Sequence, residues 1–191
     1  MMRIITGKAR GTRLATLEGE MTRPTAERTK EAVFSMLRAR IPDAEVLDLF
    51  AGSGQLALEA LSQGASRAVL CDASRAAERV IRSNAEKTHL SEQCEILCAD
   101  AMSVLSRYAG MRKFDLVFLD PPYAAGLIPQ VLATLLDREL LSPDACVMCE
   151  TAKAEDVFAE RTELAGRFEI LRASRYGAAH ITILTPKGDE K

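Results

Sequence analysis

A chemically unusual tetrapeptide follows an apolar run in the second half of the chain. Residues 114–119 read FDLVFL, which is typical of a buried strand, and the next four residues are Asp120, Pro121, Pro122 and Tyr123. A carboxylate accepts hydrogen bonds, proline lacks an N–H and fixes φ, and a tyrosine ring offers a flat face for stacking. The alternative interpretation is a strand end followed by a turn. The acidic residues elsewhere in the chain favour a functional site.

Three further acidic residues lie at or near the ends of strand-like runs. Asp48 lies in VLDLF, Asp72 ends AVLCD, and Asp100 follows CEILC after one intervening residue. Ligands of parallel sheets bind beyond the carboxyl ends of the strands, so these carboxylates and Asp120 should converge on one edge. Four converging carboxylates repel one another unless ligand groups or water separate them. The pattern therefore indicates a ligand rich in hydrogen-bond donors.

A turn with two glycines, DLFAGSG, connects the first of these strands to a helix. Gly52 and Gly54 allow close approach of the backbone and leave the amides at the helix N-terminus free to bind an anion. The dinucleotide pattern G-x-G-x-x-G fails because residue 57 is alanine, and the sequence contains no G-x-x-x-x-G-K-[ST] phosphate loop. Asp72 has the spacing of an acid that binds ribose hydroxyls, and Asp100 would lie near an adenine. A nucleoside with a small carboxylate-bearing tail fits this spacing better than a pyrophosphate.

Strand-like and helix-like segments alternate along most of the chain. A basic hairpin formed by 3–6 and 12–17 should precede a helix that begins at Arg23-Pro24-Thr25. Seven strands are expected, at 46–50, 68–72, 94–98, 114–119, 145–150, 168–177 and 179–186. Helices are expected between them, at 54–63, 74–89, 101–108, 127–138 and, more weakly, after 154. Repeated strand and helix units predict a doubly wound, mostly parallel α/β sheet with an antiparallel C-terminal hairpin.

Length and composition are those of an ordinary globular protein. The chain has 191 residues, of which 48% are hydrophobic and 27% charged, so disordered and fibrous classes are excluded. We expect a single domain, with a basic hairpin and helix extension at 1–40 and a core at 41–186. No run approaches the roughly 20 apolar residues of a membrane span or forms a signal peptide, so a cytoplasmic location is expected.

The cysteines are expected to be reduced, buried thiols, because their number is odd and most lie in apolar runs. Cys146-x-x-Cys149 has the spacing of a ligand pair, but the chain has two histidines and no second C-x-x-C, so no metal is expected. Neither a Ser-His-Asp arrangement nor a Pro-Cys pair indicates a nucleophile. The five cysteines are Cys71, Cys94, Cys98, Cys146 and Cys149.

Charge is distributed unevenly around the small net value of −2. Residues 1–40 contain nine basic and four acidic side chains, a net charge of +5, which leaves −7 for the rest. A basic leading segment on an acidic body suggests contact with a polyanion through one face. A solvated basic helix is the alternative interpretation. The basic residues nearest to the expected cleft are Lys8, Arg10, Arg13, Arg23, Arg28 and Lys30.

Several motifs together resemble those of class I S-adenosylmethionine-dependent methyltransferases. They are VLDLFAGSG, LALEALSQGA, LCDASRAA, CADA and FDLVFLDPPY. With the opening RIITGKARGTRL and RPTAERTKEAVFSML, the chain resembles the bacterial RsmD family, whose members methylate N2 of a guanine in 16S ribosomal RNA. This resemblance implies a Rossmann-like fold, S-adenosylmethionine as cofactor, and a 16S ribosomal RNA substrate held within a small-subunit particle.

The resemblance also implies roles for individual residues. Asp48, Gly52 and Gly54 would line the methionine part of the cofactor, Asp72 the ribose and Asp100 the adenine; Phe50, Ser53 and Ala101 complete the expected cofactor set. Asp120 and the Pro121 carbonyl would accept the two N–H groups of an amine, Pro122 would keep that carbonyl in place, and Tyr123 would stack on the base. Gln55 and Ala57 differ from the smaller residues common in the family, and Asp72 is one methylene shorter than the common glutamate.

The expected RNA contacts are Lys8, Arg10, Arg13, Arg23 and Arg28, and a monomer is expected. Two other functions remain open. Adenine-N6 methyltransferases carry related tetrapeptides, although a recognition domain for duplex DNA is missing from the sequence. An RNA-binding ribosome-assembly module without catalytic activity would keep the fold, although the intact tetrapeptide and glycine turn argue against it.

Overall fold

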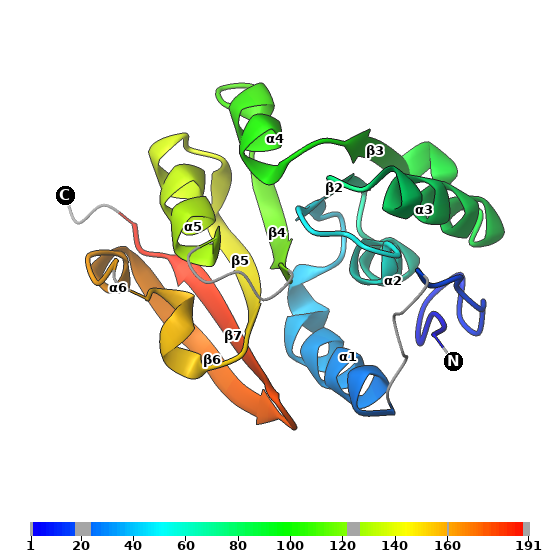
Figure 1. Cartoon of the computed structure of the whole chain (residues 1–191), viewed down its shortest axis with the longest axis horizontal. Coiled ribbons are helices and arrows are strands. Elements are labelled where there is room, and N and C mark those ends of the chain that lie inside the picture. Colours follow the sequence, from blue (N-terminus) through cyan, green and yellow to red (C-terminus); the bar gives the residue numbers. More distant parts are fainter. Residues whose placement is uncertain (1, 18–23, 122–126, 160, 189–191) are drawn as a thin grey trace.

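A seven-stranded sheet forms the centre of the molecule (Figure 1). The computed structural model describes residues 2–17, 24–121, 127–159 and 161–188. The strand order is β3-β2-β1-β4-β5-β7-β6; the first five are parallel, and β7 is antiparallel to β5 and β6. The strands span Glu45–Asp48 (β1), Arg67–Asp72 (β2), Cys94–Cys98 (β3), Phe114–Leu119 (β4), Leu141–Thr151 (β5), Phe168–Tyr176 (β6) and Ala179–Pro186 (β7). The predicted α/β sheet with its antiparallel C-terminal hairpin is confirmed.

Helices cover both faces of this sheet. One face packs against α1 (Pro24–Leu37), α2 (Gln55–Ser62) and α3 (Arg75–Lys87). The other packs against α4 (Ala101–Tyr108), α5 (Leu127–Asp137) and α6 (Leu164–Arg167). Three short 3-10 helices are η1 (Arg38–Arg40), η2 (Ser91–Gln93) and η3 (Ala154–Val157). The weak helix expected after 154 is therefore replaced by η3 and the four-residue α6.

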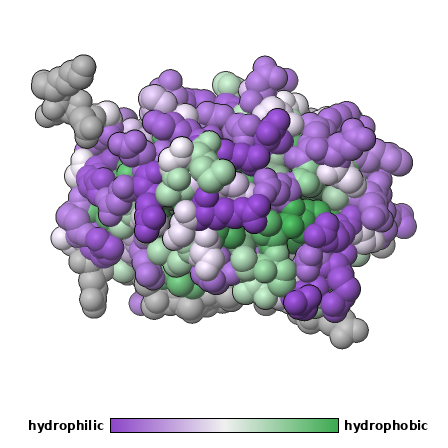
Figure 2. Space-filling model, turned by 90° about the horizontal axis from the view of Figure 1, so that it is seen from above, coloured by the Kyte–Doolittle hydropathy of each residue, from purple (hydrophilic) through white to green (hydrophobic). Residues whose placement is uncertain are grey.

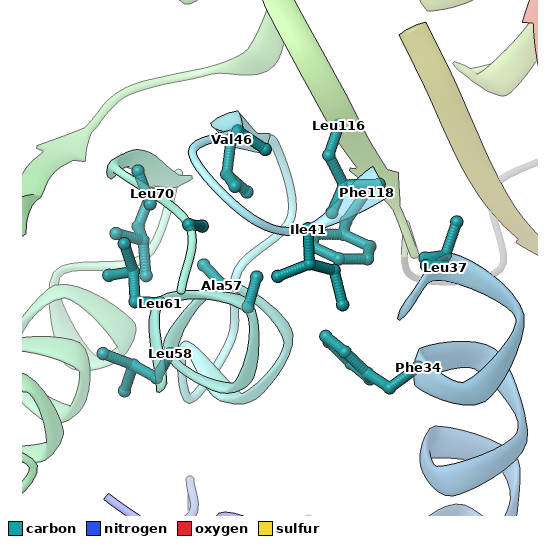
Figure 3. Close-up of a cluster of buried hydrophobic side chains, with 14 of the residues drawn as sticks. Phe34, Leu37, Ile41, Val46, Ala57, Leu58, Leu61, Leu70, Leu116 and Phe118 are labelled. Carbon is teal, nitrogen blue, oxygen red and sulfur yellow. The ribbon is translucent and has the colours of Figure 1, made fainter. Parts of the chain in front are cut away.

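Alternate residues of β4 supply the two cores. Phe118 packs on the α1 side in the same cluster as Phe34 (Figure 3). The centroids of these two rings lie 5.8 Å apart. Val117 and Leu119 join the cluster beneath α4 and α5. A parallel strand covered on both faces is apolar at successive positions, which explains the run FDLVFL. The same alternation separates Cys146 from Cys149.

Most of the cysteines are buried. Cys71, Cys146 and Cys149 are buried free thiols, as predicted, and burial raises the pKa of Cys71 to about 12. Cys146 and Cys149 lie in the cores on opposite faces of the sheet, so their thiols cannot share one metal ion. Cys98 at the end of β3 is exposed, which the sequence did not indicate.

The N-terminal segment, defined as residues 2–17, forms the predicted short hairpin. Its pairing is a single antiparallel bridge between Arg3 and Arg13. Ile4 N donates to the Thr12 carbonyl across the hairpin, whereas Ile5 N and Thr6 N donate to the Glu59 carboxylate of α2 at 2.8 and 2.9 Å. A buried helix side chain thus replaces the strand ladder. The cross-strand pairing of this short hairpin therefore ends before residues 5 and 6, which the sequence did not indicate.

Polar residues cover most of the face seen in Figure 2, and apolar side chains gather towards its middle. Among the described residues, the large hydrophobic side chains that are exposed are Met111, Ile170 and Leu171. None of the described helices is long and apolar enough to cross a membrane.

Candidate active site

A cavity of about 830 Å³ lies at the carboxyl ends of the parallel strands. This is the edge at which doubly wound sheets bind ligands. Of the predicted site residues, nine line it: Asp48, Phe50, Gly52, Ser53, Asp72, Asp100, Ala101, Asp120 and Pro121. Pro122 and Tyr123 lie outside the described residues. The expected convergence of four strand-end carboxylates on one hollow is therefore observed.

The glycine loop, defined as residues 51–54, lies between β1 and α2, and its first three residues line the cavity. Ala51 N donates to the Cys71 carbonyl of β2 at 2.9 Å, which fixes the loop to the neighbouring strand. Gly52 and Gly54 have φ angles of 53° and 78°, which residues with a side chain rarely adopt. Gly54 does not line the cavity; it precedes α2, and a Cβ there would approach Leu70 at 3.2 Å. Backbone conformation and packing therefore explain why residue 54 is glycine, and no ligand contact is needed to explain it.

Asp48 is a buried acid in the lining of the cavity, and one of its oxygens is unmatched. It is 2% exposed, and its Oδ1 has no hydrogen-bond partner among the described residues. Burial raises the pKa of Asp48 to about 7, against the opposing effect of the Ala57 and Phe50 N–H groups, and the Asp72 charge raises it further. A buried carboxylate oxygen without a donor is costly. The site therefore fits a ligand that brings an N–H donor or a positive charge.

Asp72 holds the glycine loop from the end of β2. Its Oδ2 accepts from Gly52 N at 2.9 Å, and its Oδ1 accepts from Ser74 N at 2.8 Å. Each carboxylate oxygen has a further lone pair for a ligand hydroxyl. The shorter aspartate thus sits close enough to the backbone to order the loop, a role the sequence did not reveal.

Asp100 has a structural role as the N-cap of α4. Its carboxylate accepts from Ser103 N at 2.9 Å and from Ser103 Oγ at 2.6 Å. These hydrogen bonds lower the pKa of Asp100, which is otherwise exposed to solvent. Both its position on the cavity and its ionised state suit a hydrogen bond from a ligand amine.

The β4 end of the cavity contains a carboxylate that the sequence reasoning missed. Asp120 and Pro121 follow β4, and Glu150 near the end of β5 lines the same hollow. Glu150 is half-buried, and burial raises the pKa of its carboxyl group. The signal was available, because ACVMCE ends in an acid as the other strands do.

The N-terminal segment and α1 supply the expected basic residues, and the segment also supplies part of the cavity wall. Lys8, Arg10, Arg13 and Arg28 are exposed, and Arg10, Arg13 and Arg28 form no ion pair within the described part of the chain. Arg23 lies outside the described residues. Two members of the segment that the sequence did not single out, Met2 and Leu17, line the cavity.

Lys30 does not belong to the predicted basic face. It is 4% exposed, and its Nζ lies 3.2 Å from Glu59 and 2.6 Å from the Arg3 carbonyl oxygen. Burial lowers the pKa of Lys30, and the charge of Glu59 opposes that effect. Including Lys30 among the residues around a nucleic acid was therefore wrong, because its ammonium group holds the N-terminal segment on α2.

Comparisons with known proteins agree with the motifs. A family model described as "Conserved hypothetical protein 95" matches residues 2–185. "Ribosomal RNA small subunit methyltransferase D" of Haemophilus influenzae is 36% identical over 153 residues, 80% of this chain and 79% of that protein. "Putative rRNA methyltransferase YlbH" of Bacillus subtilis is 31% identical over 98% of this chain and 100% of that protein.

A solved structure shares the whole fold. "Putative methyltransferase yhhF from Escherichia coli" superposes with a TM-score of 0.83 and 30% identity, covering 98% of this chain and 99% of that one. The shared fold, the cavity at the strand ends and the length of the match all indicate one family. The chain therefore belongs to the family described as Conserved hypothetical protein 95, the RsmD family that its motifs resemble.

Proposed function

We propose that this protein transfers a methyl group from S-adenosylmethionine to the exocyclic N2 amine of a guanine in small-subunit (16S) ribosomal RNA. Relatives named small subunit methyltransferase D support methylation of ribosomal RNA, and the resemblance to the RsmD family supports guanine N2. The observation that carries the proposal is the single cavity shared by the glycine loop, three strand-end carboxylates and the Asp120-Pro121 pair.

The residues of the cavity fit the cofactor. The unmatched Oδ1 of Asp48 suits the ammonium group of the methionine part, and the glycine loop beside it admits close backbone approach. Asp72 can accept from ribose hydroxyls while it holds Gly52 N, and Asp100 can accept from the adenine amine. When bound, the cofactor supplies an electrophilic methyl group on a sulfonium sulfur.

At the other end of the cavity, Asp120 and Pro121 can hold the amine. An aromatic amine is a weak nucleophile because its lone pair is delocalised into the ring. A carboxylate and a backbone carbonyl that accept its two N–H groups orient the nitrogen and balance the positive charge that develops on it. Asp120 would also accept the proton released from the nitrogen.

Exposed arginines on the N-terminal segment and on α1 suit the RNA backbone. Arg10, Arg13 and Arg28 have no carboxylate partner among the described residues, so their charges are available to phosphates. A chain with so small a recognition surface would read a base displayed by an assembled particle. We propose that the protein acts as a monomer on the small subunit, in the cytoplasm where subunits are assembled.

Transfer of labelled methyl groups to isolated small subunits tests the proposal. The wild type should label the RNA, and Asp120→Ala and Asp120→Asn should lower the rate at least 100-fold while S-adenosylmethionine still binds. Nucleoside digestion of the product should yield N2-methylguanosine. Recovery of N6-methyladenosine would establish the adenine alternative, and S-adenosylmethionine binding without any transfer would favour the assembly module.

A further inference from the structure

Glu150 occupies a position that the proposed chemistry does not yet explain. It lies one residue before the end of β5, whose neighbours are β4 on one side and β7 on the other. Its backbone is paired with Ile181 of β7, so the side chain projects from a strand held on both sides. A site residue on such an element is well fixed. Its position in the cavity is thus set by the sheet itself.

The register of the sheet places Glu150 next to Asp120. β4 and β5 are parallel and pair Phe118 with Met148 and Leu119 with Cys149, so Asp120 and Glu150 are the next residues along the two strands. Neighbouring strands lie about 4.8 Å apart. Both residues line the cavity, so two carboxylates reach the same end of it from adjacent strands.

No cation among the described residues forms an ion pair with the Glu150 carboxylate. Half-buried acceptors of this kind are satisfied by water or by a ligand. Because the residue faces the hollow that would receive the substrate base, a donor on that base is the partner that fits. Asp120 is already assigned to the amine, so the second carboxylate needs a second donor.

Guanine presents such a pair of donors. Its N1–H and its N2 amine are adjacent on the Watson–Crick edge, the edge by which a base taken out of the helix is read. Adenine carries its amine beside N1 as well, but that N1 is an acceptor and would direct a lone pair at the carboxylate. Two neighbouring hydrogen-bond acceptors therefore match the N1–H and the N2 amine of guanine. One of them would repel N1 of adenine.

We propose that Glu150 is a specificity residue that accepts the N1–H of the target guanine while Asp120 and Pro121 hold its N2 amine. This inference rests on the proposed function, since it assigns a role within the same site. It predicts that the protein reads the base by N1–H as well as by the amine that it methylates. A site built around a donor rejects analogues that lack it far more strongly than a site that relies on apolar contact.

2-Aminopurine separates the two contacts, because it keeps the N2 amine and carries an acceptor at N1. The substrates are small subunits reconstituted with guanine or 2-aminopurine at the nucleotide that the wild type modifies. The ratio of kcat/KM for guanine to that for 2-aminopurine is measured for the wild type, Glu150→Gln and Glu150→Ala. Glu169→Gln, which changes an exposed carboxylate on β6, is the matched control.

The wild type should prefer guanine by about 100-fold or more. Glu150→Gln should lower this ratio at least tenfold, because its amide can donate to N1 of 2-aminopurine, and Glu150→Ala should also lower it. Glu169→Gln should leave it unchanged. Affinity for S-adenosylmethionine should stay the same in all variants.

A residue with a merely structural role would slow both substrates equally. An unchanged ratio in both Glu150 variants, or a wild type that accepts both bases alike, would overturn the assignment while leaving guanine-N2 methylation intact. A wild type that methylates no guanine at N2 would overturn the proposed function together with this inference.

Discussion

Replacing Asp48 by asparagine should stabilise the protein without cofactor and weaken its binding of S-adenosylmethionine. Asp48 is 2% exposed, its Oδ1 lacks a partner among the described residues, and burial raises its pKa to about 7. Asparagine has nearly the same shape but carries no charge. The substitution therefore removes the cost of burying an ionised group, along with the charge that attracts an ammonium group.

The magnitude follows from the two pKa values. The gap between about 7 in the folded chain and 3.8 for an ordinary aspartate corresponds to about 4 kcal/mol, an upper limit, at 1.36 kcal/mol for each tenfold change in proton affinity. Between these values the folded protein binds more protons than the unfolded chain. This contribution to the free energy of unfolding is therefore present below about pH 4, declines as the pH rises to about 7, and is lost above that.

Urea unfolding without cofactor at pH 4.5, 6 and 8 measures this decline. The variant should gain up to about 4 kcal/mol over the wild type at pH 8 and little at pH 4.5, and titration calorimetry should show its affinity for S-adenosylmethionine reduced at least tenfold. Asp144→Asn, at an exposed position in β5, controls for loss of a surface charge. A stability difference that does not change with pH would refute the reasoning, because it would mean that burial does not perturb the Asp48 carboxylate.

Three other substitutions test the remaining parts of the site. Lys30→Met should cost about 3–5 kcal/mol in urea unfolding, because it leaves the Glu59 carboxylate buried without its cation; adding Glu59→Gln should recover part of this loss. Asn84→Ala removes three hydrogen bonds of a fully buried amide, so we expect a loss of about 2–4 kcal/mol and faster amide exchange in the N-terminal segment. Replacing Arg10 and Arg13 by glutamate should weaken RNA binding and its salt dependence in filter-binding assays, with S-adenosylmethionine affinity unchanged. Equal loss of both affinities would contradict that separation.

The strands of the sheet could be predicted because their signals are local. β4 is apolar at successive positions, and the structure assigns the strand the predicted residues, Phe114–Leu119. β5 was predicted from residue 145, yet it begins at Leu141, since Leu141 pairs with Phe114 across an irregularity in the register. Ser142, Pro143 and Asp144 show no strand pattern of their own. Pairing with a neighbouring strand extended this element, which a local pattern cannot reveal.

The contacts of the N-terminal segment with α2 could not be predicted for a related reason. Its donors at residues 5 and 6 bond to Glu59, more than 50 residues away in the sequence. Ser62 adds further ties, since its hydroxyl accepts from Ala9 N at 2.9 Å and its carbonyl from Lys8 N at 2.8 Å. On an isolated helix, Glu59 and Ser62 look like solvent-facing residues. Their burial depends on a segment that covers them, so charge and periodicity alone misplace Lys30 and do not show where the hairpin pairing ends.

Asn84 connects the N-terminal segment, which carries exposed arginines, to the glycine loop that lines the cavity. Its amide accepts from Ala15 N at 2.8 Å and donates to the Ala15 carbonyl and to the Ser53 carbonyl of the glycine loop, each at 2.9 Å. Met2, at the start of the segment, accepts from Ser53 Oγ through its sulfur at 3.1 Å. The stretch that carries the exposed arginines is thus tied at both ends to the loop expected to hold the cofactor. RNA docked on those arginines would therefore meet a surface whose position relative to the methyl donor is already fixed, which suits a reaction that depends mainly on orientation.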